Sequence, residues 1–168
     1  MPRQAFLPEA LLLLCLREGR LDCGFLTAIE NDPLDFIPLF EDPMLAIAAP
    51  DHPLSKRTSL PLHEIKKYPL ISQFQGSDHD VQQIFRKAKI RPKTKYILDD
   101  DISVMGMVAQ DEGIALMPEL MLRTGGFRLS RIPLDPPQYR SIGLATLPLK
   151  ETTLLVRTFA AFCKDYDF

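Results

Sequence analysis

The sequence predicts an α/β fold, because strand-like and helix-like segments alternate along most of the chain. The clearest example lies in residues 70–98. There a short apolar strand precedes apolar residues at i, i+3, i+4 and i+7, the spacing of one helix face, and an alternating strand follows. The 168 residues are 46% hydrophobic and 25% charged, which suits a globular protein that buries a core. Alternation of this kind favours mainly parallel sheets.

The first 50 residues predict a helix, a buried strand and a long extended segment. Glu9–Arg20 is typical of a helix, since Pro8 suits its first position and Gly19 its end. Leu21–Ile29 is a short apolar run bounded by turn formers, as expected of a buried strand. The segment 36–49 has two prolines in its first part, which place that part at a sheet edge or outside the ladder.

The remainder of the chain predicts further strands and helices, separated mainly by proline and glycine. The expected strands are residues 70–72, 93–98, 114–117, 128–134 and 140–147. The expected helices are residues 62–67, 102–110, 118–124 and 152–163, together with one whose apolar face runs from Val81 to Ala88 and whose cap is Ser77 or Asp78.

Charge and cysteine content argue against several classes of protein. A net charge of -2 and a pI of about 5.9 do not supply the basic surface that nucleic-acid binding usually requires. Three cysteines without a C-x-x-C pair argue against a disulfide framework or a structural zinc site, so we expect a cytoplasmic chain. No apolar stretch approaches the ~18 residues of a membrane span, and the start lacks a convincing export signal.

The usual anchors of enzyme active sites are also missing. The chain has no G-x-S-x-G, Walker A or G-x-G-x-x-G sequence. His52, His63 and His79 form no H-x-x-x-H or H-x-H pair, so a three-ligand metal site lacks its spacing. We therefore expect no enzyme, no cofactor and no metal, and a structural or solvent-exposed role for the three histidines.

One turn, in the segment GSDHDV, has the features of an anion site. Gly76 and Ser77 lie at the start of a helix, where unpaired N–H groups and the helix dipole attract negative charge. The alternative is that Ser77 or Asp78 merely caps the helix. Asp78 and Asp80 weaken the anion interpretation, because they already supply negative charge.

Three consecutive aspartates, Asp99, Asp100 and Asp101, separate a predicted strand from a predicted helix. Carboxylates at this position cap helices and complement the helix dipole, so capping is the favoured role. Acid–base catalysis would need a partner group, and a magnesium site would need oxygen ligands from elsewhere. The sequence marks neither.

Four segments of the chain follow one another in a known order: LREGRLDCGF, PLFEDPMLAIAAPDHPLS, MVAQDEGIALMPE, and RIPL with RSIGLA. In order and spacing they resemble the LysR-type transcriptional regulators across nearly the whole chain. The resemblance implies the effector-binding domain of that family. This domain has two Rossmann-like α/β lobes of the type II periplasmic-binding-protein kind, with a small-molecule effector in the cleft between them.

The resemblance also implies how the chain divides. Lobe 1 would comprise residues 1–48 plus 142–168, and lobe 2 residues 49–141, with crossovers near Ala48 to Pro50 and Tyr139 to Ser141. Lobe 1 would be incomplete, because the family's first strand, first helix and second strand would precede this chain. The DNA-binding winged helix-turn-helix would be missing too, so DNA would be bound only through that N-terminal domain.

The residues that the resemblance places around the effector are Thr27, Ala28, Ser72, Gln73, Gly76, Ser77 and Asp100. In this interpretation Asp100 faces the ligand while Asp101 caps the helix. We also expect a homo-oligomer, since an unpaired strand and the run Leu11–Leu14 would otherwise face water. The alternatives are a free-standing solute-binding protein of the same fold and, less favoured, an α/β enzyme.

Overall fold

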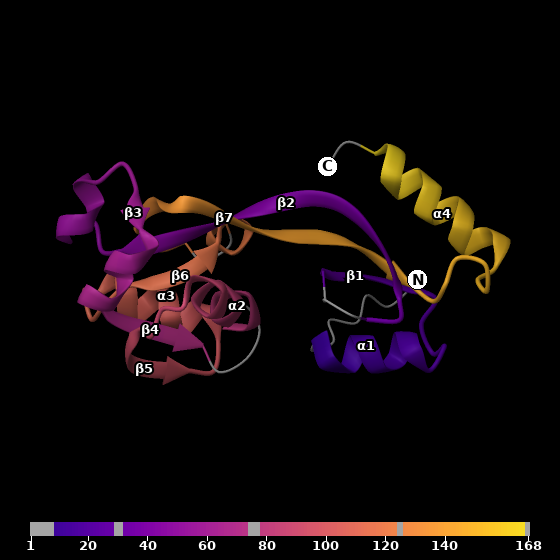
Figure 1. The fold of residues 1–168 in the computed structure, drawn as a ribbon, viewed down its shortest axis with the longest axis horizontal. Coiled ribbons are helices and arrows are strands. Elements are labelled where there is room, and N and C mark those ends of the chain that lie inside the picture. The colour runs from indigo at the N-terminus through magenta and orange to yellow at the C-terminus, as the bar shows by residue number, and fades with distance from the viewer. Residues whose placement is uncertain (1–8, 29–31, 74–77, 124–125, 167–168) are drawn as a thin grey trace. The chain divides into compact units, whose positions relative to one another are not determined.

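The computed structural model describes residues 9–28, 32–73, 78–123 and 126–166, and strands and helices alternate along it (Figure 1). The strands are β1 (Cys23–Thr27), β2 (Asp35–Ala48), β3 (Leu60–Pro61), β4 (Pro69–Gln73), β5 (Lys93–Leu98), β6 (Ala115–Pro118) and β7 (Ser130–Thr146). The α-helices are α1 (Glu9–Arg17), α2 (Asp78–Ala88), α3 (Asp101–Ala109) and α4 (Leu154–Asp165). Three short 3-10 helices complete the order: η1 (Pro53–Lys56), η2 (Leu62–Lys67) and η3 (Glu119–Arg123).

The chain forms two compact units. Unit 1 comprises Met1–Glu41 and Ser141–Phe168, and unit 2 comprises Asp42–Arg140. The first division therefore falls before the expected boundary at 48/49, and the second falls at 140/141. Strands β2 and β7 both continue across a division, so each contributes residues to both units.

The sheets of unit 2 combine parallel and antiparallel pairs. Strands β4 and β5 are parallel, and Leu70 of β4 forms a further parallel bridge with Ile114. Residues 44–47 of β2 pair antiparallel with β6, whereas the two residues of β3 pair in parallel with β7.

Unit 2 also holds the larger core, in two clusters of fifteen and eight buried residues. Helix α2 contributes Val81, Ile84 and Phe85 to the first cluster, as predicted from their spacing, whereas Ala88, the fourth residue of the predicted face, is exposed. Helix α3 contributes residues 104, 105 and 108 to the second cluster. Successive β4 residues point to opposite faces, so Leu70 lies in the first cluster and Ile71 in the second.

Unit 1 has two smaller clusters, each with three buried residues. Strand β1 pairs antiparallel with β7, from Cys23 opposite Thr146 to Thr27 opposite Ile142. Leu144 and Ala145 are neighbours on β7 and belong to different clusters, which contain residues of α4 and α1 respectively. Helices α1 and α4 therefore cover opposite faces of this part of the sheet.

Gly143 shows how closely the strands of unit 1 approach. A Cβ atom at this position would lie 2.5 Å from the ring of Phe36 and nearer still to the carbonyl oxygen of Ile37. Atoms without a bond between them do not approach so closely, so β7 requires glycine here.

One expectation about the sheets is wrong. The sheets are not mainly parallel, since β2 pairs antiparallel with β6 and β1 antiparallel with β7. The chain enters unit 2 along β2 and leaves it along β7. Each of these strands has an antiparallel neighbour, β6 for β2 and β1 for β7. The proline-containing part of β2 precedes the stretch that pairs with β6, which fits the expected position at a sheet edge. Proline is tolerated there because Pro38 and Pro43 both precede residues 44–47, the stretch that pairs with β6.

The segments 128–134 and 140–147 are not separate strands either. They merge into β7, which runs through three prolines from Ser130 to Thr146. The prolines suggested a turn, but proline also fits extended backbone wherever its missing N–H is not needed.

Candidate functional site

The candidate site in unit 2 lies where β4 and β5 end. In the parallel register Gln73 stands opposite Leu98, so Ser72, Gln73 and the aspartates after Leu98 reach the same edge of the sheet. Ligands of α/β proteins bind at this carboxyl edge. Ser72 is buried and Gln73 is half-buried, and both take part in interactions within the fold.

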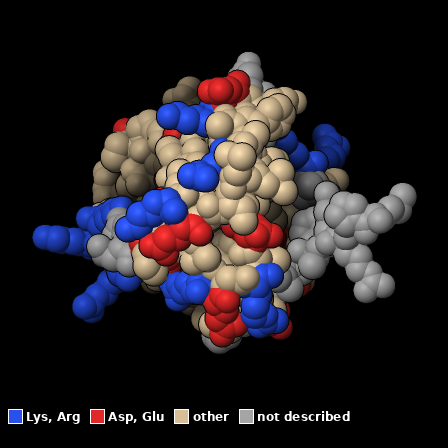
Figure 2. All heavy atoms as spheres, turned by 90° about the vertical axis from the view of Figure 1, so that its right-hand side faces the viewer, with Lys and Arg blue, Asp and Glu red and all other residues tan. Residues whose placement is uncertain are grey.

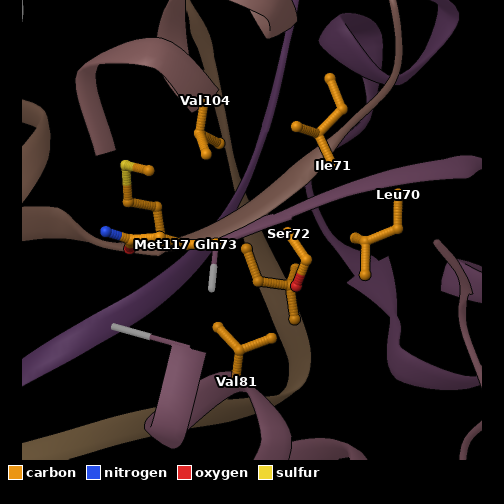
Figure 3. Close-up of a pocket in the computed structure, with 8 residues that line it drawn as sticks. Leu70, Ile71, Ser72, Gln73, Val81, Val104 and Met117 are labelled. Carbon is orange, nitrogen blue, oxygen red and sulfur yellow. The ribbon is translucent and has the colours of Figure 1, made fainter. Parts of the chain in front are cut away.

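A small cavity lies inside the protein beside these two residues (Figure 3). It is lined by Leu70, Ile71, Ser72, Gln73, Val81, Val104, Leu116 and Met117. Figure 3 shows Val81 of α2 and Val104 of α3 on opposite sides of β4. The volume of about 10 Å³ is at the lower limit for one water molecule. An effector therefore does not fit inside this cavity, and contact with Gln73 would be made from its exposed side.

Asp100 is the N-cap of α3. Its Oδ1 accepts from the backbone N–H of Ser103 at 2.8 Å, and its Oδ2 accepts from the hydroxyl of Ser103 at 2.7 Å. The Ser103 hydroxyl, followed by the backbone N–H groups, holds the pKa of Asp100 below its ordinary value.

The expected capping role of the aspartates is therefore confirmed, but its assignment to Asp101 is wrong. Asp101 is the first helical residue, since the helix starts one position later than the cap. The sequence analysis did not predict Ser103 as the hydrogen-bond partner of the cap, although a serine three residues after a capping aspartate is a recognisable partner.

A buried ionic cluster joins the two ends of unit 2. Arg140 donates to Oδ2 of Asp42 from Nη2 at 2.8 Å and from Nε at 3.0 Å, and Oδ1 of Asp42 accepts from the Leu120 N–H at 3.0 Å. Asp80 of α2 lies 3.8 Å from Nη1 of the same guanidinium. Burial raises the pKa of Asp80, and Arg140 partly offsets that effect. Asp42 and Arg140 are 98 residues apart, so the sequence alone gave no signal that they pair.

The remaining candidate residues are in unit 1 or outside the described part of the chain. Thr27 ends β1 opposite Ile142, and the Ala28 N–H donates to the carbonyl of Ser141 at 2.9 Å. Both Thr27 and Ala28 are half-buried. Gly76 and Ser77 lie outside the described residues, as does the side chain of Asp78, so the cap of α2 stays a prediction.

Two of the described histidines, His52 and His79, have local partners. His52 Nδ1 accepts from the Leu54 N–H at 3.1 Å and so caps η1, and His79 lies 3.0 Å from the amide of Gln83. Within the described ranges, no group of three or more His, Cys, Asp or Glu side chains is arranged to hold a metal ion. No helix in the described part of the chain is long and apolar enough to cross a membrane.

Two α/β units connected by strands that pass through both, with polar residues at the ends of parallel strands, define a type II periplasmic-binding-protein fold. The sequence profile of the LysR substrate binding domain matches residues 9–167. The chain belongs to this family, and the expected fold is confirmed.

Known relatives agree with this assignment. The chain is 27% identical over 155 residues to the HTH-type transcriptional regulator YybE of Bacillus subtilis. This alignment covers 90% of this chain and 53% of YybE. The effector binding domain of QuiR in complex with shikimate has a TM-score of 0.78 at 23% identity, covering 95% of this chain and 78% of that domain. The Synechocystis PCC6803 CcmR regulatory domain in complex with 2-PG has a TM-score of 0.77 at 21% identity, covering 92% and 77%. The chain spans about half the length of the curated relatives it matches.

Proposed function

We propose that this chain is the small-molecule-sensing regulatory domain of a LysR-type transcriptional regulator. The observation that carries the proposal is the family match, which extends over both units. The QuiR and CcmR domains, which share the fold, were solved with shikimate and 2-PG, and this supports a small molecule as the ligand. Effector binding would shift the populations of conformations and so change how the whole regulator acts on DNA.

The proposed effector contacts are Ser72, Gln73 and Asp100 in unit 2 and Thr27 and Ala28 in unit 1, with Gly76 and Ser77 retained from the sequence. Gln73 offers both a donor and an acceptor for orienting a ligand. Asp100 accepts two hydrogen bonds from Ser103, yet an ionised carboxylate has about four acceptor positions and can accept more.

Thermal-shift screening of the folded chain against a metabolite library tests this function. A ligand at a hundred times its Kd stabilises by about 2.7 kcal/mol, which is readily measured as a rise in Tm. Gln73→Ala should reduce the rise in Tm that a stabilising compound produces, whereas Gln110→Ala, at the far end of α3, should not. If no compound raises the Tm, or if both variants respond alike, the proposed contacts are wrong.

We infer further that the chain associates with another copy of itself through unit 1. Leu11 and Leu14 of α1 are 39% and 46% exposed, and Leu154 and Leu155 of α4 are 72% and 79% exposed. Exposed apolar residues gathered on one unit favour association. Light scattering tests this, and a monodisperse monomer would contradict it.

The proposed function places the chain in the cytoplasm without catalytic activity of its own, since the relatives it matches are transcriptional regulators. The second candidate, a free-standing solute-binding protein, shares the fold. An in-frame helix-turn-helix in the coding region upstream would favour the regulator, and an export signal would favour the solute-binding protein.

A further inference from the structure

Unit 2 contains a hollow that none of the proposed effector contacts lines. Its volume is about 420 Å³, within the range of roughly 300–1,000 Å³ that small-molecule sites occupy. Strand β2 lines it with residues 43–45, β7 with residues between 131 and 139, and η3 with Glu119. Every lining residue belongs to unit 2, so this unit alone forms the hollow.

The apolar walls of the hollow are rigid. Three of the lining residues are prolines, namely Pro43, Pro133 and Pro137. A proline ring has almost no side-chain freedom to lose, so packing a ligand against it costs little entropy. Met44 and Leu134 also line the hollow, and both are buried members of the larger core cluster. These walls therefore suit an apolar side chain that packs in a fixed position.

The two charged residues of the lining carry opposite signs. Glu119 is half-buried and Arg131 is exposed, and the lining holds no other charged side chain. Across the described residues, neither takes part in an ion pair, whether with the other or with a third residue. The hollow thus presents a carboxylate and a guanidinium that do not neutralise each other directly.

A hydrogen bond of Arg131 fixes where the positive charge lies. Its Nη2 donates to the carbonyl of Leu122 at 3.0 Å, and Leu122 is the fourth residue of η3, whereas Glu119 is the first. Three residues of a 3-10 helix rise about 6 Å, which separates the anchor points of the two charges. An ammonium and a carboxylate on one carbon atom, with a hydrogen bond of about 3 Å on each side, span a similar distance.

The lining also has hydrogen-bonding capacity for both charges of such a ligand. A guanidinium has five N–H donors, and the bond to Leu122 uses one of them. Gln138 lines the hollow too, and its Nε2 donates to the carbonyls of Pro136 and Pro137 at 3.0 Å each. These bonds hold the amide in place, and its oxygen can accept from an ammonium.

The charge of the molecule as a whole does not select one sign of ligand. Figure 2 shows basic and acidic side chains close to one another on the same face, and the net charge of the chain is -2. A mixed surface of this kind concentrates neither anions nor cations, so selection must come from groups at the hollow itself. The hollow has one group of each sign.

We propose that this hollow is a second small-molecule site, which binds a zwitterion with an apolar side chain, that is, a neutral α-amino acid. Arg131 donates to the carboxylate, Glu119 accepts from the ammonium, and the apolar side chain lies against the proline rings. Gln73 and Asp100 are not among the lining residues, so binding here does not require an effector at those contacts.

Titration of the 168-residue chain with L-phenylalanine, followed by calorimetry and by NMR, tests the proposal. Two analogues each lack one charge, since 3-phenylpropionate has no ammonium and phenethylamine has no carboxylate. Each analogue should bind at least about tenfold more weakly than L-phenylalanine, because it loses a hydrogen bond between charged groups. L-leucine keeps both charges and a bulky apolar side chain, so it should bind as well.

Two variants separate the roles of the two charges. Arg131→Gln should weaken L-phenylalanine about tenfold, the typical loss of a hydrogen bond to a charged group. Glu119→Gln should weaken it to a similar extent but leave 3-phenylpropionate unchanged, since that analogue has no ammonium. Glu119→Gln also keeps the bond between Arg131 and Leu122, so it decides the matter if Arg131→Gln does not fold.

Arg128→Gln is the matched control, because it removes the same charge from an exposed position in unit 2. It should leave L-phenylalanine binding unchanged, as should Gln73→Ala at the proposed effector contacts. Retained L-phenylalanine binding in Gln73→Ala, alongside a reduced response to effector, therefore distinguishes the two sites.

Four results would overturn the proposal. The first is that neither L-phenylalanine nor L-leucine binds, and the second is equal binding of the three phenyl compounds. The third is equal loss of L-phenylalanine affinity in Glu119→Gln and Arg128→Gln, with Tm values and circular dichroism matched to wild type. The fourth is loss of L-phenylalanine binding in Gln73→Ala, which would place the amino acid at the effector contacts.

Discussion

Units 1 and 2 both pack helices against strands, but they cover their apolar residues to different degrees. Unit 2 has clusters of fifteen and eight buried residues, whereas each cluster of unit 1 has three. The two largest exposures among the described apolar side chains, Leu154 and Leu155, also occur in unit 1. The same architecture can therefore bury most of its apolar residues within one unit, while the other unit needs further contacts to cover them.

The largest expected difference in the free energy of unfolding concerns one Arg–Asp pair in each unit. The side chains of Arg140 and Asp42 in unit 2 are 12% and 3% exposed, whereas in unit 1 Arg17 is 47% exposed and its partner Asp32 is 7% exposed. The two pairs thus differ mainly in the exposure of the arginine. Arg140→Met should lower the free energy of unfolding by about 3–5 kcal/mol, because it leaves Asp42 buried without its partner. Arg17→Met should cost less, because water reaches this pair from the exposed side of Arg17. Urea denaturation measures both, and similar costs would mean that burial does not separate the two pairs.

Matched core truncations test whether the units unfold separately. Leu54 in unit 2 and Leu16 in unit 1 are both fully buried. Each Leu→Ala change should cost about 2–5 kcal/mol locally. Leu16→Ala should speed amide exchange in β1 while leaving β4 and β5 protected, because the unit with the smaller core opens first. Equal acceleration in both units would indicate a single cooperative structure.

Gly→Ala substitutions at two positions should have smaller effects on stability. They test how far the backbone of each unit can shift to accommodate a methyl group. A Cβ at Gly113 would lie 2.5 Å from the backbone oxygen of Pro69, and one at Gly143 would meet the ring of Phe36 and the oxygen of Ile37. Each Gly→Ala change should cost about 1–3 kcal/mol through overpacking. Gly113→Ala should cost more, since the larger core of unit 2 leaves less freedom to shift. Thermal unfolding of the two variants shows whether that order holds.

The smallest effect concerns the cap of α3. Asp100→Ala should lower stability by removing the acceptor of two hydrogen bonds, whereas Asp101→Ala should change it less. The pKa of Asp100 is lowered in the folded protein, so its contribution is present at neutral pH. It is lost as the pH falls through the lowered pKa. Stability measured between neutral and acidic pH should therefore fall less in Asp100→Asn than in wild type. A greater loss in Asp101→Ala would reverse the assignment.

Local structure was predictable where one periodicity dominated. The expected strand 93–98 has the observed bounds of β5, and the apolar face of α2 was read from its spacing. Asp100 and Asp101 show the limit of such predictions, because helix ends are uncertain by a residue or two and the cap depends on which residue is first. The alternation of strands and helices predicted the α/β class, and the family resemblance added the periplasmic-binding-protein fold, which periodicity alone leaves open.

Features that depend on distant pairing could not be predicted. The prolines of β2 and β7 suggested breaks, since local sequence does not reveal which N–H groups a neighbouring strand needs. The Asp42–Arg140 pair likewise arises only when separate segments fold together.

The ion pair of Asp42 and Arg140 has a topological consequence. These residues are the first and last of unit 2, and their side chains meet at 2.8 Å. Unit 2 is thus an insertion within the chain of unit 1, and an ion pair joins the first and last residues of the insertion. A segment closed in this way is suited to gain, loss or exchange as a single module, because its ends already lie side by side. Residues 42–140 should accordingly fold when expressed alone, whereas unit 1 consists of two pieces of chain that meet through the pairing of β1 with β7.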